Sequence, residues 1–448
     1  MSDRRTALIL RHGHRLVPRY TSYPTAPHFT PANGPAQYRR WLAGIEPGKS
    51  GSLYIHVPFC RTLCWYCGCT TRATQKMGPV HAYLDLLEQE LRLVAGTMPH
   101  RLPLTHIHWG GGSPTMVPPD RFASFMNLVR DLFDIRPDAE IAVECDPRQV
   151  SAELAGAMAE SGVNRASLGI QTFDAEVQRA INRVQPFGQV QDCVETLRAA
   201  GIGDINADLL LGLPGQTTQS AEASTRQALE LRPQRAAIFG YAHVPAIRKH
   251  QRLIREADLP GATERLRQAD AMGRVMMDAG YREVGLDHYT LPGDSMAVAL
   301  DNRTLRRNFQ GYTTDGAEIL IGIGTSAIGS LPAGYLQNSP DVRQWSAAIE
   351  SGEFAVARGL ALTPEDRMRR EIIEQLMCYL EVDAELVAER HCLPTPDFDL
   401  GQLEAEGVAD VQGSHIRIRS EYRLLSRVAA SAFDEYLGAG AARHSVAV

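Results

Sequence analysis

The chain has 448 residues, of which 44% are hydrophobic and 22% charged, and this length calls for a large α/β domain with a smaller domain beside it. The net charge of -6 argues against nucleic acid as a partner, and no apolar stretch approaches the ~20 residues that a membrane span requires. We therefore expect a cytoplasmic protein that has neither a nucleic-acid nor a membrane partner.

Residues 1–47 show no clear periodicity and are interpreted as an N-terminal arm that lies on the main domain. From residue 48 to 345, short β-rich runs alternate with helix-like segments. The β-rich runs are 53–57, 105–109, 140–144, 165–170, 204–211 and 235–240. The helix-like segments are 81–95, 119–133, 151–161, 174–200, 219–231 and 262–279. This alternation predicts parallel strands with right-handed crossovers, that is, an α/β fold with a partial (βα)6 TIM-like barrel.

Residues 346–448 have a different pattern, which predicts a small, mainly helical domain. A helix is expected over 364–379, a hairpin over 408–418 with Gly413 in its turn, and a last helix over 428–437. Helices with a β-hairpin suggest a winged-helix-like arrangement. The acidic balance of the chain favours a lid or packing role over DNA binding.

Residues with chemical potential follow the predicted strands, where a parallel barrel gathers its active site. They are the cysteines after the first run, glycines 110–112 after the second, Glu144 ending the third, Gln171 after the fourth, Asp208 within the fifth and residues 241–243 after the sixth. Glycines there allow a ligand to approach the backbone closely. A lone carboxylate at a strand end is as often a helix cap, and Arg183 as often a solvated helix residue.

Cys60, Cys64 and Cys67 form a C-x3-C-x2-C motif, with Cys69 two residues further on. Thiolates are the usual ligands of iron–sulfur clusters, and three of them bind three irons of a [4Fe-4S] cluster and leave the fourth iron open. An open iron suits catalysis, because a methionine group can chelate it and receive an electron on its sulfonium. A zinc site is the alternative, but zinc favours C-x2-C pairs and four ligands, and Cys69 is awkwardly placed to be the fourth.

The motif, with the aromatic Tyr66 before its third cysteine, resembles the signature of the radical S-adenosylmethionine (SAM) superfamily, so the barrel is expected to be of the radical SAM type. The whole chain from about residue 18 resembles the oxygen-independent coproporphyrinogen III oxidase (dehydrogenase) family of haem biosynthesis. The resemblance is carried by segments 18–25, 68–69, 108–115, 144–148, 167–171, 182–183, 208–214, 241–243 and 308–314. Departures are small: Ser113 replaces a usual Thr, and Cys145 replaces a usual aliphatic residue.

The resemblance implies a [4Fe-4S] cluster on the three cysteines and two SAM molecules. The cluster-bound SAM would meet Tyr54, Tyr66, Gly111, Glu144, Ala242 and Ile328. The second SAM would meet Gly112, Ser113, Gln171, Arg183 and Asp208. No residue is assigned a catalytic role of its own, because the cofactors carry the chemistry.

The activity implied is that of an oxidoreductase that converts two propionates of coproporphyrinogen III to vinyl groups, giving protoporphyrinogen IX. A 5′-deoxyadenosyl radical removes a hydrogen from the propionate β-carbon, and loss of carbon dioxide and one electron leaves the double bond. Arg19 and Arg307 are predicted to bind substrate carboxylates, and segment 308–314 either walls the tetrapyrrole pocket or is a plain hairpin. An electron donor for the cluster and a monomeric state are also expected.

Two other functions share parts of this pattern. A haem-binding chaperone on the same barrel would be expected to lack segments 68–69 and 308–314, and both are present. A radical enzyme acting on a different tetrapyrrole, such as a haem-degrading methyltransferase, would be distinguished by the mass of its product.

Overall fold

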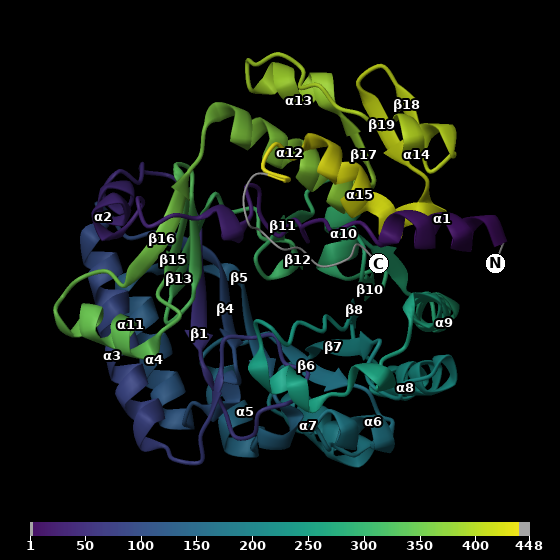
Figure 1. Cartoon of the computed structure of the whole chain (residues 1–448). Coiled ribbons are helices and arrows are strands. Elements are labelled where there is room, and N and C mark those ends of the chain that lie inside the picture. The colour runs from purple at the N-terminus through teal and green to yellow at the C-terminus, as the bar shows by residue number, and fades with distance from the viewer. Residues whose placement is uncertain (1–2, 439–448) are drawn as a thin grey trace.

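The computed structural model describes residues 3–438 and is centred on a curved, twelve-stranded sheet (Figure 1). Neighbouring strands β13, β1, β4, β5, β6, β7 and β8 run parallel in that order. Their bounds are β1 Gly51–Val57, β4 Pro103–Gly111, β5 Asp134–Cys145, β6 Arg165–Gln171, β7 Asp204–Leu211, β8 Arg235–Gly240 and β13 Ile319–Ile323. The six predicted strands are confirmed, and β13 adds a parallel neighbour on the other side of β1 that was not expected.

Antiparallel strands extend the sheet at both ends, so the parallel part does not close on itself. They are β9 Arg282–Val284, β10 His288–Thr290, β14 Ile328–Leu331, β15 Gly334–Asn338 and β16 Val356–Ala361. Because the sheet continues through β16, we propose that the barrel domain extends to Ala361 rather than to residue 345.

Helices cover the outer face of the curved sheet (Figure 1). They are α3 Gly78–Thr97, α4 Pro119–Leu132, α5 Ala152–Glu160, α6 Ala175–Ala180, α7 Phe187–Ala199, α8 Thr218–Glu230, α9 Ala262–Asp278 and α11 Val342–Glu350, with α10 Ser295–Asp301 after β10. Apolar residues at helical spacing pack inward, for example Leu84, Leu87 and Leu91 of α3, each almost fully buried. The prediction of one helix over 174–200 is wrong, because Asn182 has a positive φ of 55° and Pro186 cannot continue a helix.

The arm contains two helices that the sequence analysis did not predict, α1 Asp3–Gly13 and α2 Pro35–Ala43. Leu8 and Ile9 of α1 pack into the core of the C-terminal domain, whereas α2 lies beside the barrel. Figure 1 shows the N-terminal helix, in purple, alongside the yellow C-terminal segments. The arm therefore joins the two larger parts of the molecule.

The C-terminal domain caps the open side of the sheet (Figure 1). Its elements are α12 Pro364–Tyr379, β17 Glu381–Asp383, α13 Ala384–Arg390, α14 Gly401–Ala405, β18 Ala409–Gln412, β19 His415–Ile418 and α15 Ser426–Ala430. The helix over 364–379 and the hairpin with Gly413 in its turn are confirmed. The prediction of a helix over 428–437 is wrong, because this stretch contains only the end of α15 and a short 3-10 helix at Ser431–Phe433. Within residues 3–438, no helix has the length and apolar character needed to cross a membrane.

Candidate active site

The cysteine loop, residues 58–77, leaves the end of β1 and is tied down on several sides. Its short strands β2 (Phe59–Cys60) and β3 (Arg72–Ala73) pair with each other in parallel. Asn182 Nδ2 donates a hydrogen bond to the carbonyl of Leu63 (3.0 Å), and Gln251 Nε2 donates to the carbonyl of Tyr66 (2.9 Å). His250 Nε2 lies 2.7 Å from the carbonyl oxygen of Cys67. The loop conformation is thus fixed by residues that lie far away in the sequence.

The three motif thiols lie near one another and are not in disulfides. Burial raises the pKa of Cys60 to about 11, opposed by a hydrogen bond with Thr71 (Sγ–Oγ1 3.2 Å) and reinforced by the charges of Cys67 and Cys64. The hydrogen bond from the Cys69 thiol lowers the pKa of Cys67 to about 7, and the Cys69 amide also donates to Cys67 Sγ (3.4 Å). Cys69 therefore lies beside Cys67.

The donor set fits a cluster better than a single ion. Within residues 3–438, no three His, Cys, Asp or Glu side chains converge closely enough to hold one metal ion. A single zinc ion would need such convergence, whereas the thiolates of a cubane bind different irons and stay further apart. The arrangement of Cys60, Cys64 and Cys67 on one loop is compatible with a [4Fe-4S] cluster and gives no support to a zinc site.

Arg183 lies next to these thiols, in the break between α6 and α7. Its Nη1 donates to Cys64 Sγ (3.5 Å), and its Nη2 and Nε donate to the carbonyl of Gly169 (2.6 and 3.1 Å). Asp146 Oδ1 lies 3.7 Å from the same guanidinium. The helix break missed by the sequence analysis therefore brings this buried cation under the cysteine loop. The alternative interpretation of Arg183 as a solvated helix residue is wrong, because its side chain is buried.

Glu144 lies opposite the glycine-rich end of β4. Its Oε1 accepts from His108 Nε2 (3.0 Å), and its Oε2 accepts from the amide of Gly111 (3.1 Å). Tyr54 stacks on His108 with ring centroids 5.9 Å apart. A Cβ on Gly110 would stand 2.9 Å from both Glu144 Oε1 and Tyr54 Cε2, so a larger residue there would have to displace these two side chains. The structure brings the predicted residues Tyr54, Gly111 and Glu144 together and adds His108.

Asp208 lies further along the same edge of the barrel. Ser167 Oγ and Asn206 Nδ2 each donate a hydrogen bond to its carboxylate, and both bonds are 2.8 Å long. Burial raises the pKa of Asp208 to about 6, against these hydrogen bonds, and the charge of Glu144 adds to the rise. Gln171 ends β6 with a positive φ of 68°. Its side-chain amide packs against Gly169 and would lie only 3.0 Å from a Cβ added at that glycine. Gln171 and Arg183 thus flank the same glycine.

The remaining predicted residues are less closely joined. Gly112 packs against the backbone of Phe59, and Ser113 Oγ is buried in a 2.6 Å hydrogen bond with Thr115 Oγ1. The carbonyl of Ala242 accepts from Gln251 Nε2 (3.2 Å), the amide that also holds Tyr66. Ile328 starts β14 and packs against the hydrophobic cluster that contains Phe29 and Tyr335.

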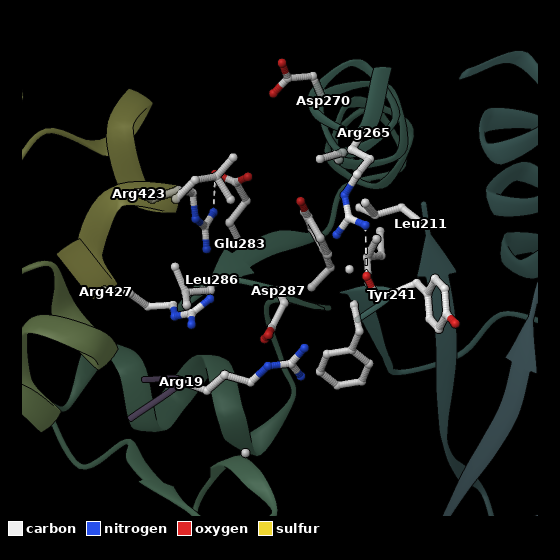
Figure 2. Close-up of a pocket in the computed structure, with 18 of the residues that line it drawn as sticks. Arg19, Leu211, Tyr241, Arg265, Asp270, Glu283, Leu286, Asp287, Arg423 and Arg427 are labelled. Atoms are coloured by element: carbon white, nitrogen blue, oxygen red, sulfur yellow. Dashed lines mark hydrogen bonds and ion pairs between the residues drawn. The ribbon is translucent and has the colours of Figure 1, made fainter. Parts of the chain in front are cut away.

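A cavity of about 920 Å³ opens between the barrel, the arm and the C-terminal domain (Figure 2). Ala242 and its neighbours Tyr241 and His243 line one side of it. Its charged residues are Arg5, Arg19, Arg265, Arg274, Arg307, Arg423 and Arg427, with Asp270, Glu283, Asp287 and Glu421. The wall thus carries more arginines than carboxylates in a chain whose net charge is negative.

The arginines are close enough to affect one another. Burial, together with the charges of Arg19 and Arg307, lowers the pKa of Arg427 to about 10. Burial and the charge of Arg19 also lower the pKa of Arg265. Arg19 and Arg307, which were predicted to bind substrate carboxylates, both line the cavity. Arg265 and Arg427 also line it and were not singled out, because no local pattern marks them. Mutually repelling guanidiniums that face one cavity are suited to an anionic ligand.

The hairpin of β11 (Arg306–Asn308) and β12 (Gly311–Thr313) contributes Arg307 and Phe309 to this wall. Thr21, Arg307 and Phe309 also line a second cavity of about 480 Å³. Segment 308–314 is therefore part of a hairpin and also contributes to a cavity wall. The sequence had offered these as alternatives, a plain hairpin or a wall of a pocket.

Comparisons with known proteins agree with this geometry. Residues 54–228 match the model of the Radical SAM superfamily. The chain is 47% identical to the oxygen-independent coproporphyrinogen III oxidase of Bradyrhizobium diazoefficiens, over 99% of this chain and 100% of that protein. It is 42% identical to the enzyme of the same name from Paracoccus denitrificans, with 96% of each chain covered.

A solved structure supports the same assignment. The coproporphyrinogen III oxidase of Escherichia coli, described as a radical SAM enzyme, aligns with a TM-score of 0.89 at 36% identity. The alignment covers 93% of this chain and 97% of that one, so arm, barrel and C-terminal domain are all included. The chain belongs to the oxygen-independent coproporphyrinogen III oxidase family of the radical SAM superfamily.

Proposed function

We propose that this protein converts two propionate side chains of coproporphyrinogen III to vinyl groups, giving protoporphyrinogen IX. The observation that carries the proposal is the arginine-rich cavity next to the cysteine loop. Gln251 connects the two, because its amide donates to both Tyr66 in the loop and Ala242 in the cavity wall. A substrate that carries carboxylates can therefore lie within reach of a cofactor held by the loop.

The cofactors proposed are a [4Fe-4S] cluster on Cys60, Cys64 and Cys67 and two SAM molecules. When bound, the cluster and SAM supply a 5′-deoxyadenosyl radical that takes one hydrogen atom from the substrate. We assign the cluster-bound SAM to Tyr54, Tyr66, Gly111, Glu144, Ala242 and Ile328. We assign the second SAM to Gly112, Ser113, Gln171, Arg183 and Asp208.

The hydrogen bonds of the site support these assignments. His108 orients the Glu144 carboxylate, which suits it to accept from an amino group or from ribose hydroxyls. Tyr54 OH donates to His56 Nδ1 (3.0 Å), because His56 Nε2 is committed to the carbonyl of Thr70 (3.0 Å). The tyrosine ring is therefore held in place beside Glu144, with its position fixed before any ligand binds.

Arg19 and Arg307 are proposed to bind substrate carboxylates. Arg307 Nη2 donates to the carbonyl of Arg19 (3.2 Å), which links the arm to the β11–β12 hairpin. Arg307 also lies over the ring of Tyr312, 4.4 Å from its centroid. The arm and the hairpin thus present two guanidiniums to the cavity as a single unit.

An anaerobic turnover assay tests the proposal. Reconstituted protein with reductant, SAM and coproporphyrinogen III should yield the divinyl product and 5′-deoxyadenosine. Cys60→Ser should abolish both products, whereas Cys392→Ser, which alters an exposed cysteine of the C-terminal domain, should leave them unchanged. Formation of 5′-deoxyadenosine without decarboxylation would refute the substrate assignment, and a methylated or ring-opened product would favour the other tetrapyrrole chemistry.

Three features stay predictions from the sequence. They are the electron donor for the cluster, the monomeric state and the cytoplasmic location. Sedimentation of the purified protein checks the monomer, and reduction of the cluster by candidate donor proteins checks the electron supply.

A further inference from the structure

Asp270, Glu283 and Asp287 are the partly buried carboxylates of the cavity, whereas Glu421 is exposed, and Asp287 is the one of these three that is paired with a histidine and not with an arginine. Asp270 is paired with Arg5 (3.0 Å), and Glu283 is paired with Arg423. Asp287 lies in the turn between β9 and β10, with about one fifth of its side chain exposed (21%). Figure 2 shows its carboxylate between the guanidiniums of Arg19 and Arg427.

One oxygen of Asp287 is committed and the other is not. His288 Nδ1 lies 2.6 Å from Oδ1 and donates to it. Within the described range 3–438, Oδ2 accepts no hydrogen bond, although it belongs to a residue that lines the cavity. A charged oxygen without a donor is costly where water is displaced, so a ligand that fills this cavity must supply one.

The position of Asp287 is rigid. The amide of Ile238 donates to its carbonyl (2.7 Å), which ties the turn to β8. The His288 ring meets Phe239 and Tyr312 edge to face, with centroid distances of 5.7 and 5.4 Å. An imidazole held by two aromatic rings fixes the direction of its N–H bond and, through it, the carboxylate plane.

Asp287 also stays ionised. Burial alone would favour its neutral form, but the His288 hydrogen bond and the charges of Arg307 and Arg19 hold the pKa of Asp287 below its usual value. The cavity therefore contains a fixed anion surrounded by cations. A ligand that only carried carboxylates would be repelled at this point, so the ligand must present donors there.

A porphyrinogen has this pattern of groups. Its four pyrrole N–H groups point toward the centre of the macrocycle, and its propionates project from the rim. Arginine side chains can donate to the propionates but cannot accept from the pyrroles, because a guanidinium has no acceptor atom. A single carboxylate can accept from two neighbouring N–H groups at once.

Building on the proposed function, we propose that Asp287 accepts hydrogen bonds from the pyrrole N–H groups of the porphyrinogen while the surrounding arginines bind its propionates. Asp287 is then a positioning residue that fixes the centre of the macrocycle, and His288 orients it. Turning the macrocycle about this centre brings a second propionate to the place of the first. The same contact serves both decarboxylations.

The competing explanation is that Asp287 only balances the charge of the arginines. The two roles predict effects of opposite sign for Asp287→Asn. In the variant, the amide oxygen keeps the His288 hydrogen bond, and the NH2 group faces the cavity, where it opposes pyrrole N–H donors. Pyrrole binding would therefore be lost. A mere counter-ion, when removed, would leave a more positive cavity that binds a polyanion more tightly.

The test measures dissociation constants anaerobically on the reconstituted holoenzyme for coproporphyrinogen III and for its tetramethyl ester. The ester keeps the pyrrole N–H groups and lacks the carboxylate charges. We expect Asp287→Asn to weaken both ligands by roughly 10- to 100-fold, the range for loss of a charge-assisted hydrogen bond. Asp301→Asn is the matched control, because this substitution removes the same charge at an exposed site. Asp301 pairs there with Arg282 of β9.

Asp287→Glu retains the charge, and so the balance of the arginines, while displacing the carboxylate by one methylene. We expect it to weaken the ester as well, whereas a counter-ion role predicts no change. Unchanged ester binding in both variants, or tighter binding of the free acid to Asp287→Asn, would overturn the proposal. A wild-type enzyme that does not convert coproporphyrinogen III would instead refute the proposed function itself.

Discussion

Gly112 is the point where the glycine-rich end of β4 meets the cysteine loop, and Gly112→Ala tests that contact. A Cβ at this position would lie 2.8 Å from the carbonyl oxygen of Phe59, 2.9 Å from its amide nitrogen and 2.4 Å from Thr71 Oγ1. The Thr71 side chain can rotate away. The Phe59 backbone directly precedes Cys60 and cannot rotate, so the added methyl group must push the loop itself.

The displacement follows from these distances. Ordinary van der Waals contact begins at 3.4 Å, so the backbone at Phe59 must move about 0.6 Å from its 2.8 Å position. Overpacking of this kind costs ~1–3 kcal/mol of unfolding free energy. Since Cys60 is the next residue, most of the shift is transferred to the first thiol of the motif.

Thermal unfolding and iron content of the anaerobically reconstituted protein measure the effect. We expect Gly112→Ala to lower the melting temperature by a few degrees and to lower the iron bound per chain. The control is Gly156→Ala in α5, where a Cβ meets no atom within 4 Å and the helix should gain up to about 1 kcal/mol. Wild-type iron content and stability in Gly112→Ala would refute the close contact between β4 and the loop.

Three further substitutions give separate expectations. Arg183→Met should lower the unfolding free energy by about 1–3 kcal/mol in urea, because the buried hydrogen bonds of Arg183 to the carbonyl of Gly169 are lost while Gln185 still donates to that carbonyl and Arg148 still pairs with Asp146, whereas the exposed Arg179→Met should change it little. The pKa of Asp208, raised to about 6, predicts that SAM affinity increases as pH rises from 5 to 7 and that Asp208→Asn removes this dependence. A carboxyl group whose pKa is raised on folding stabilises the fold at a pH below its pKa in the unfolded chain, and this contribution is lost as the pH rises toward 6. The stability of Asp208→Asn relative to wild type should therefore increase between pH 4 and 7, as measured by calorimetry. A stability difference that does not change with pH would contradict the raised pKa. Arg265→Gln should raise KM for coproporphyrinogen III about tenfold without changing SAM cleavage in the absence of substrate, and an unchanged KM would exclude a role in carboxylate binding.

The parallel strands were predictable because each is short, apolar and followed by a helix. β7 and β8 begin and end where the sequence analysis placed them. The strand β13 was missed because the β11–β12 hairpin separates it from the preceding helix α10, and because another strand, β14, follows it instead of a helix. The helix break before Phe187 was missed because nothing in residues 174–200 besides Pro186 interrupts the helical pattern.

The cysteine motif was predictable because its ligands lie within eight residues of one another. The cavity was only partly predictable, because its wall combines Arg19 of the arm, Arg265 of α9 and Arg427 of α15. Each of these residues looks like an ordinary surface arginine in its own segment. Only the tertiary fold brings them to one space, so Arg265, Arg427 and Asp287 carry no local signal in the sequence.

The N-terminal arm and the C-terminal domain meet beside the cavity. Arg427 donates to the carbonyls of Val17 (2.5 Å) and Pro18 (2.9 Å), and Tyr20 OH donates to Asp434 (3.0 Å). During synthesis, the barrel and its cysteine loop are made long before Arg427 exists. The wall of the cavity is therefore complete only when the C-terminal domain has docked on the arm and the barrel. A chain that stopped before α15 would keep the barrel and the cysteine loop but lack Arg427 and the wall that it helps to form.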